Sequence, residues 1–399
     1  MTSSRVAPLW LLTLITFSGT LAMHIFVPAL PEAARELGAT IGEMQLTMSV
    51  YIFGLAVGQL AYGPLSDRFG RRPMLMIGLV IYGVTGIAAS FAPDVHSLIV
   101  IRLFQALGGC AGLVIGRAIV RDSGTATQAG RRLALMNLMV AIGPGTAPLV
   151  GGALTTFFGW RSIFYLLATL GVINIIFTWL LLPETHSKTT APGIAALARN
   201  YRSLLSSPAF LGYAVGGGCA TTSMYAFISA SPFIFAHQLH RPEYEVGLYL
   251  AILIGGIWVG SALTARLITR LSLDRLTIGA NLLSVLAAAI FLIAVLSGHL
   301  SVPLAVVPMF FYALGVGMAS PAALTQAISV NPNVIGSASG LYGFAQMGVG
   351  AICTALAAVG DNPALTVALV LAGAGTIAQF GFWIALRYRE PAIPTDASC

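Results

Sequence analysis

The sequence predicts an all-α integral membrane protein of twelve transmembrane helices. The chain has 399 residues, of which 57% are hydrophobic and only 8% are charged. A soluble domain carries roughly 25% charged residues, so a soluble protein of this composition could not cover its surface. Lipid removes that requirement, because it is the solvent for the outside of a membrane-spanning bundle. Each span needs about 20 apolar residues, and the chain has room for twelve.

Twelve apolar runs follow one another along the chain. The first continues to Leu30 with no cleavage site after a short core, which indicates a retained span rather than a signal peptide. Gly is abundant, with 44 residues, and small residues allow close helix packing in lipid. The runs lie near residues 8–30, 45–65, 73–92, 97–120, 133–157, 161–182, 208–236, 245–268, 276–298, 302–329, 336–359 and 364–386.

The Lys and Arg residues predict the orientation in the membrane. With the N-terminus inside, fifteen of them fall at the inner ends and only Arg35, Arg161 and Arg241 at the outer ends. Positive charge gathers on the cytoplasmic side of membrane proteins. We therefore expect a protein of the bacterial inner membrane with both termini in the cytoplasm. The net charge of +7 then reflects inner loops rather than nucleic-acid binding.

The longest polar connection divides the chain into two halves of six spans. We expect an N-terminal bundle over residues 1–183, a cytoplasmic linker over 184–207, and a C-terminal bundle over 208–399 with a short tail. Such a division is expected of transporters built as two-fold pseudo-repeats, although the sequence similarity between the halves is faint.

Ionisable side chains are rare inside the spans. All thirteen carboxylates fall at loops or helix ends, whereas Arg102 and His24 lie within spans. An intramembrane Arg costs at least ~2.5 kcal/mol, so Arg102 either extends to the outer headgroups or faces a central cavity, paired with helix carbonyls or an anion. His24 is either a satisfied polar packing residue or a proton carrier, since its ordinary pKa is near 6.5.

The connection between the second and third runs carries the most specific motif. It reads GPLSDRFGRRP and resembles the signature loop of the major facilitator superfamily. The glycines permit a tight turn, and the Asp can accept from a helix N-terminus or an Arg and so latch the two halves on the cytoplasmic side. The alternative is an ordinary basic loop. The residues of this expected gate are Gly63, Asp67, Arg68, Gly70, Arg71 and Arg72.

Two further segments resemble the twelve-span drug:proton antiporter branch of that superfamily. Arg102, with Gln105 and Gly108, resembles the fourth-span motif. The fifth run resembles the antiporter motif that marks exporters, and its Gly and Pro residues would let neighbouring helices pack closely and rock. A purely structural role is the alternative. The motif residues are Gly143, Pro144, Gly145, Pro148, Gly151 and Gly152.

Four stretches resemble the bicyclomycin/chloramphenicol-resistance subgroup: VPALPEAARELG, GRAIVRD, FISASPFIF and GSASGLYGF. This resemblance adds Arg121 and Asp122 to the gate cluster. One position departs from the subgroup, which usually has Asp four residues before the first-span Pro, where this chain has His24. Either His24 carries the proton, or another group does, or transport is uncoupled; we favour the first.

The resemblance implies a rocker-switch cycle with a cavity lined by the first, fourth, seventh and tenth spans. Aromatic and Met side chains suit loose recognition of apolar compounds, although each of them could instead pack helices. The cavity candidates are Tyr51, Gln59, Asn137, Met224, Tyr225, Phe227 and Gln346.

These features predict export of small neutral or anionic, phenicol-like compounds by proton antiport. The alternatives are export of a sugar or nucleoside and a non-transporting membrane sensor. We expect no cofactor or metal beyond the coupling proton, no nucleic acid, and a monomer whose partners are lipid and substrate. The chain has no G-x-S-x-G, H-E-x-x-H or P-loop motif that would indicate an enzyme.

Overall fold

The described part of the chain is built from helices, and twelve spans are long and apolar enough to cross a membrane. The computed structural model describes residues 7–122, 126–184, 194–331 and 334–388. The predicted fold class is confirmed. Ten of the spans are single helices: α3 (Ile41–Phe69), α4 (Arg71–Ser90), α5 (Val95–Asp122), α6 (Ala126–Phe158), α7 (Arg161–Leu181), α11 (Glu243–Leu267), α12 (Leu273–Leu296), α13 (Val302–Ser329), α14 (Ile335–Ala357) and α15 (Pro363–Arg387).

The first span is broken near its middle. Helix α1 (Leu9–His24) is followed by the short 3₁₀ helix η1 (Val27–Ala29) and then by α2 (Leu30–Leu37). Pro28 has no N–H to offer the carbonyl of His24 four residues earlier, so the α-helical hydrogen-bond pattern stops there. His24 therefore lies at the C-terminal end of α1, where unsatisfied carbonyls stabilise a positive charge.

The seventh span is also divided. It consists of α9 (Pro208–Thr222), α10 (Met224–Phe233) and η2 (Ile234–Gln238). Ser223 lies at the break, and its hydroxyl lies 2.7 Å from the hydroxyl of Tyr312 in α13. The seventh span is thus tied to the tenth at the level where its backbone changes.

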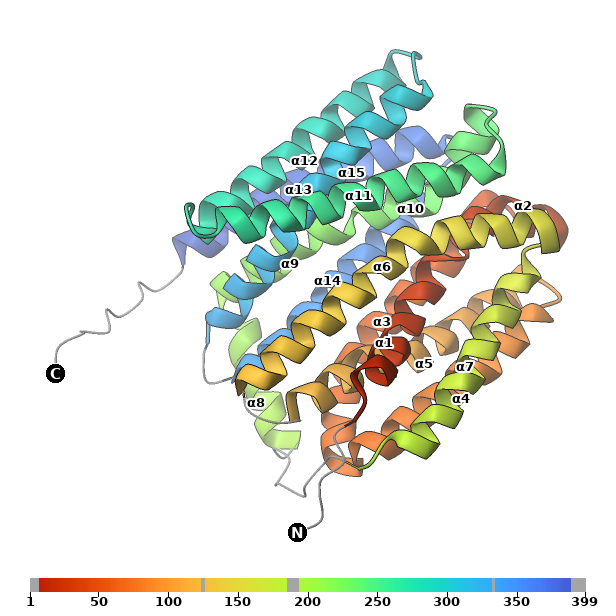
Figure 1. Ribbon diagram of the computed structural model, residues 1–399. Helices are drawn as coiled ribbons and strands as arrows, with labels where there is room; N and C mark the ends of the chain where they lie inside the picture. Colours follow the sequence, from red (N-terminus) through yellow and green to blue (C-terminus); the bar gives the residue numbers. More distant parts are fainter. Residues whose placement is uncertain (1–6, 123–125, 185–193, 332–333, 389–399) are drawn as a thin grey trace, which may run out of the picture.

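Helices α1–α7 form one bundle and α9–α15 the other, and the two meet along two pairs of helices (Figure 1). One pair is α3 with α14, and the other is α6 with α11. The amphipathic helix α8 (Ile194–Leu205) lies in the segment expected as the linker and packs on α9 and α14. The exact bounds of the halves stay a prediction.

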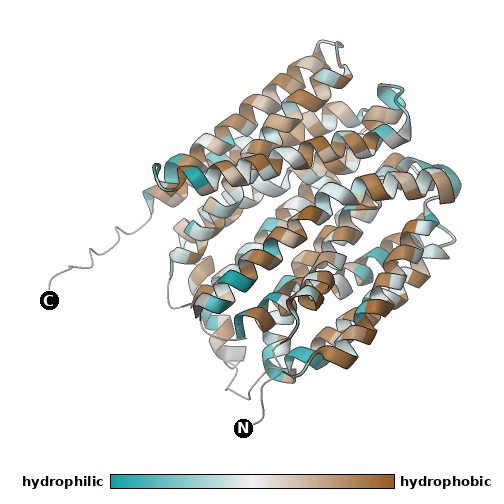
Figure 2. Cartoon of the chain, viewed as in Figure 1, coloured by the Kyte–Doolittle hydropathy of each residue, from teal (hydrophilic) through white to brown (hydrophobic). Residues whose placement is uncertain are grey.

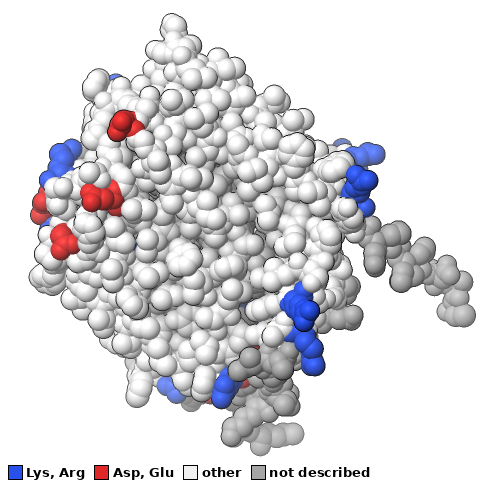
Figure 3. Space-filling model, turned by 180° about the vertical axis from the view of Figure 1, so that it is seen from behind, with Lys and Arg blue, Asp and Glu red and all other residues white. Residues whose placement is uncertain are grey.

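Charge lies at the two ends of the helices and apolar residues cover the belt between them (Figures 2 and 3). Helix α1 begins and α15 ends on the same side of this belt, as an even number of spans requires. We call this side the basic side, because Arg68, Arg266 and Arg387 all lie at helix ends there.

Candidate functional site

A pocket of about 780 Å³ lies between the two bundles. Its walls come from α1 and α6 of the first bundle and from the seventh, eighth, tenth and eleventh spans of the second. Of the residues that line it, His24, Met224, Tyr225 and Gln346 are cavity residues predicted from the sequence, and Pro144 was predicted only as part of the antiporter motif. The others are Leu138, Ala141, Ile142, Thr221, Thr222, Ile228, Ile254, Ile257, Trp258, Ser261, Ala262, Val316, Ser320 and Met347.

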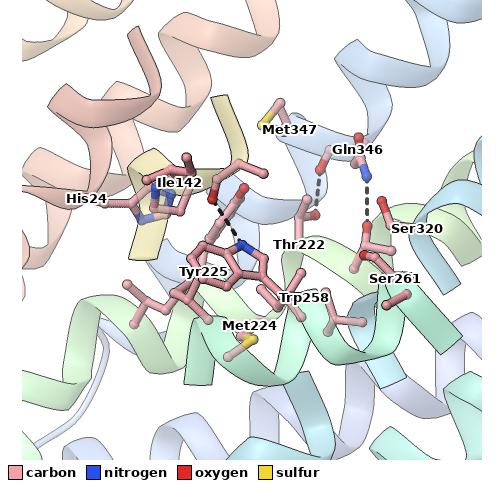
Figure 4. A pocket seen from close by; sticks show the side chains of 18 of the residues that line it. His24, Ile142, Thr222, Met224, Tyr225, Trp258, Ser261, Ser320, Gln346 and Met347 are labelled. Carbon is pink, nitrogen blue, oxygen red and sulfur yellow. Dashed lines mark hydrogen bonds between the residues drawn. The ribbon is translucent and has the colours of Figure 1, made fainter. Parts of the chain in front are cut away.

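His24 enters the pocket from the first bundle and faces Tyr225 of the second (Figure 4). The two ring centroids are 6.1 Å apart, and the imidazole side chain is 5% exposed. No hydrogen bond or ion pair joins His24 to another described residue. Its ring nitrogens are therefore available to a proton or a ligand in the pocket, at the point where the two bundles meet.

The opposite wall of the pocket is polar and belongs to the second bundle. The Gln346 side-chain amide donates to the hydroxyl of Thr221 at 2.8 Å, and Thr222 donates to the Gln346 backbone carbonyl at 2.7 Å (Figure 4). One N–H of the side-chain amide is thereby engaged. This contact holds the side chain in place, so that its side-chain carbonyl oxygen can serve as a hydrogen-bond acceptor. Ser261 and Ser320 add hydroxyls to this wall.

Trp258 was missed by the sequence reasoning. Its indole N–H donates to the carbonyl of Ala141 across the two bundles at 3.0 Å, and its ring lies against Gly145 of α6. The only signal in the sequence was a Trp in the middle of a span, away from the interfaces where Trp is enriched.

Arg102 is fully buried inside the first bundle and does not line the pocket. Its guanidinium donates to the Gln105 side chain at 2.7 Å and to the Ala22 backbone carbonyl at 3.1 Å. The ring of Tyr51 lies 4.1 Å from the guanidinium carbon, within cation–π range. The predicted pairing of Arg102 with a helix carbonyl is observed. The Arg102 side chain neither extends to the headgroups nor faces the pocket, which were the two predicted locations.

Four other cavity candidates lie away from the pocket wall. Tyr51 donates to the carbonyl of Gly19 at 2.8 Å, and Phe227 packs edge-to-face on Phe291 at 5.7 Å. Gln59 lies against Gly343, where α3 meets α14, and Asn137 is exposed on α6. In this conformation Tyr51 and Phe227 are packing residues, the alternative that the sequence had left open.

The signature motif forms a charge cluster around Arg71. Its guanidinium lies 2.6 Å from Asp67 and 3.1 Å from Asp122, and it donates to the hydroxyl of Ser66 at 2.6 Å. Arg121 lies 3.8 Å from Asp122 at the rim. These contacts join α3, α4 and α5 within the first bundle. Among the described residues no hydrogen bond or ion pair joins Asp67 to the second bundle, so the polar latch expected across the halves is not formed here.

The turn in this motif is a single residue. Helix α3 continues to Phe69 and α4 begins at Arg71, so Gly63 lies inside a helix and only Gly70 makes the turn, at φ 98°. The backbone N–H groups of Arg71 and Arg72 donate to the Glu184 carboxylate at 3.1 and 3.2 Å. Glu184, which the sequence reasoning did not single out, thereby caps α4 and ties the end of the sixth span to the motif.

We expect Arg71→Lys to lower the free energy of unfolding by about 1–2 kcal/mol, since one ammonium cannot replace three guanidinium contacts. Thermal unfolding of the purified protein in detergent measures this. Arg68→Lys is the matched control, because Arg68 is exposed next to Phe69. Equal unfolding midpoints for the two variants would contradict the assignment of Arg71 as the centre of the cluster.

The Gly and Pro residues of α6 let it approach both bundles. On one face Gly143 lies against Phe17, and Gly151 meets the carbonyl of Ile25 beside the break in the first span. On the other face Gly145 lies against Trp258, and the carbonyl of Pro148 lies next to Gly247 of α11. Gly152 is 3.9 Å, measured from an added Cβ, from Pro28. Helix α6 is therefore the close-packed partner of α1 and α11 together.

Comparison with known proteins agrees with this architecture. Residues 12–354 match the family described as Major Facilitator Superfamily. The chain is 30% identical over 339 residues to Multidrug resistance protein D of Escherichia coli, covering 84% of each chain. It is 26% identical over 347 residues to the Bicyclomycin resistance protein homolog of Haemophilus influenzae, covering 84% of this chain and 85% of the relative.

Two further comparisons extend over nearly the whole chain. An uncharacterized MFS-type transporter of Bacillus subtilis, YdgK, is 29% identical over 389 residues, covering 94% of this chain and 95% of the relative. A solved D-xylose–proton symporter superposes with a TM-score of 0.75 at 14% identity, covering 96% of this chain and 97% of that one, which shows the shared fold. The chain belongs to the major facilitator superfamily of membrane transporters, in the branch that holds these drug-resistance relatives.

Proposed function

We propose that this protein exports small neutral or anionic, phenicol-like compounds in exchange for protons. The observation that carries the proposal is the pocket between the bundles, whose described lining combines apolar and aromatic walls with a polar end and contains no carboxylate, Lys or Arg. A permanent cation would lose its water there without gaining a counter-charge. A neutral compound with hydroxyl or amide groups would meet the acceptor of Gln346 and the Ser320 hydroxyl.

The basic side is the cytoplasmic side in this proposal, in a bacterial inner membrane. The support is the excess of Lys and Arg at helix ends on that side, which follows the usual bias of membrane proteins. The names of two relatives, which refer to bicyclomycin and to multidrug resistance, support export of drugs over export of a metabolite.

His24 is the proton carrier in this proposal. It is the one imidazole on the described pocket wall, and it lies where the bundles must separate in an alternating-access cycle. Coupling requires that protonation favour one facing state over the other. A charged imidazolium at the meeting point of the bundles would favour the state in which water reaches it.

Expression in a bacterial host that lacks its main drug pumps tests the proposed substrate class. We expect a several-fold rise in the inhibitory concentration of chloramphenicol and no rise for methyl viologen, a permanent dication, because the described pocket lining holds no carboxylate. Resistance to methyl viologen without resistance to chloramphenicol would contradict the proposal. A vector without the gene and a strain with a known cation exporter are the controls.

A further inference from the structure

The threonine hydroxyls of the polar pocket wall have already given away their hydrogens. Thr221 donates to the carbonyl of Gly217 at 2.6 Å, and Thr222 donates to the carbonyls of Gly218 at 2.8 Å and Gln346 at 2.7 Å. Donation to the carbonyl four residues earlier is the usual arrangement of a hydroxyl inside a helix. A hydroxyl has one hydrogen and two lone pairs, so each threonine keeps lone pairs but has no hydrogen left for a ligand.

Ser261 and Gln346 extend this pattern across the wall. The Ser261 hydroxyl donates to the carbonyl of Gly317 in α13 at 3.2 Å. Because the Thr221 hydrogen is used, only the NH₂ group of the Gln346 amide can face Thr221, which fixes the orientation of the amide. The side-chain oxygen of Gln346 has no hydrogen-bond partner among the described residues. We call Thr221, Thr222, Ser261 and Gln346 the acceptor patch.

Few donors remain on this wall to balance the acceptor patch. They are the second amide N–H of Gln346 and the hydroxyl of Ser320, which can turn either way. A ligand that covers the acceptor patch displaces the water that satisfies such oxygens. A hydroxyl or an amide N–H on the ligand replaces those hydrogen bonds, whereas an ether or a fluorine leaves the oxygens unpaired.

The end of the pocket at His24 has the opposite character. The Tyr225 hydroxyl has no hydrogen-bond partner among the described residues, so its hydrogen is available to a ligand. The His24 imidazole carries at least one N–H whether neutral or charged. In Figure 4 the rings of Tyr225 and His24 stand apart from Ser261, with the apolar surface of Trp258 between them. The pocket therefore offers donors at one end and mostly acceptors at the other.

We propose that the pocket selects neutral compounds with a hydrogen-bond donor at one end and an acceptor at the other, bound with the donor on the acceptor patch and the acceptor at Tyr225. The inference rests on the proposed function, because it defines which phenicol-like compounds the same pocket takes. Chloramphenicol has this arrangement, with two hydroxyls and an amide N–H on its side chain and a nitro group on the far side of its ring.

Calorimetric titration of the purified protein in detergent tests the selection. The probes are chloramphenicol and its 3-deoxy-3-fluoro analogue, in which one hydroxyl is replaced by a fluorine of similar size. We expect chloramphenicol to bind about tenfold more tightly, the factor that corresponds to one hydrogen bond to an acceptor otherwise left unpaired. Equal affinities would overturn the donor preference and leave the exporter assignment standing. Binding of neither compound would refute the proposed substrate class, and this inference with it.

Variants of the acceptor patch locate the preference. Thr221→Val combined with Ser261→Ala removes two acceptors, so the ratio of affinities should fall below about twofold. Thr264→Val is the matched control and should keep the ratio, because Thr264 donates to the carbonyl of Met318 at 3.1 Å but lies outside the described pocket lining. An unchanged ratio in the double variant would overturn the proposal. Ser261→Ala alone, at an exposed position, serves should the double variant fail to fold.

Tyr225→Phe tests the orientation of the ligand. Both probes carry the same nitro group, so the loss of the Tyr225 hydroxyl should weaken both by about threefold or more and leave their ratio unchanged. Thermal unfolding in detergent checks that the variant is folded. Undiminished affinity for both probes, or a lost preference between them, would contradict the placement of the acceptor at Tyr225.

Discussion

Replacing His24 by Ala is expected to abolish drug accumulation driven by a pH gradient while drug binding persists. The imidazole is the one group of the described pocket wall that ordinarily titrates near neutral pH, and without it protonation cannot distinguish the two facing states. In everted vesicles with an acidic interior, the accumulation ratio of a phenicol should fall to that of passive equilibration. Counterflow of labelled drug without a gradient should continue, because the cavity keeps its other walls.

His24→Asp is the informative second variant. An Asp restores a titratable group at the same place, so we expect it to recover gradient-driven accumulation that His24→Ala has lost. Equilibrium binding of the drug to both variants in detergent serves as the control for folding. Full gradient-driven accumulation by His24→Ala would show that another group carries the proton or that His24 only packs.

Gly151→Ala is expected to lower both stability and transport. The added methyl group would overlap the carbonyl oxygen of Ile25, which belongs to the break in the first span. Backbone is the obstacle, so α6 and α1 must separate; overpacking of this kind costs about 1–3 kcal/mol. Separation would also displace His24, one residue before Ile25. The unfolding midpoint in detergent and phenicol export in cells measure the two effects.

Gly255→Ala is the matched control for that substitution. Gly255 lies inside α11 with no atom within 4 Å of an added Cβ, and Ala is a better helix former than Gly by up to about 1 kcal/mol. It should therefore unfold at the same temperature as the natural protein or higher. A Gly151→Ala variant as stable as Gly255→Ala would show that α6 and α1 are not in close contact.

The twelve helices could be read from the sequence because lipid imposes a strong rule: each crossing needs an uninterrupted apolar run, and hydropathy detects it. The break beside His24 was not predicted, although Pro28, which causes it, lies within the first apolar run. Helix ends were harder. Helix α3 runs through the motif to Phe69 rather than ending near residue 65, and Pro64 lies inside it. A Pro does not end a membrane helix when neighbouring groups form hydrogen bonds with the backbone carbonyl that it leaves without a partner. Polar residues at the headgroup level do not end the helix either.

The pocket could be predicted only in part. His24, Met224, Tyr225 and Gln346 were identified because a polar or aromatic residue in an apolar span attracts notice. Which face of a span meets the partner bundle depends on packing between helices distant in sequence. Trp258 was missed for that reason, and Arg102, for which a place at a central cavity was one of two expectations, is enclosed by the first bundle.

The described lining of the pocket holds no carboxylate, which favours neutral or anionic substrates, and this also bears on the energy source of the proposed transport. When one proton enters for each neutral molecule that leaves, one positive charge crosses the membrane in every cycle. A potential of 100 mV then adds about 2.3 kcal/mol to the drive, and twice that for a monoanionic drug. Export of phenicol-like compounds should therefore respond to voltage even at equal pH on both sides, so that a potassium diffusion potential alone would drive accumulation in vesicles.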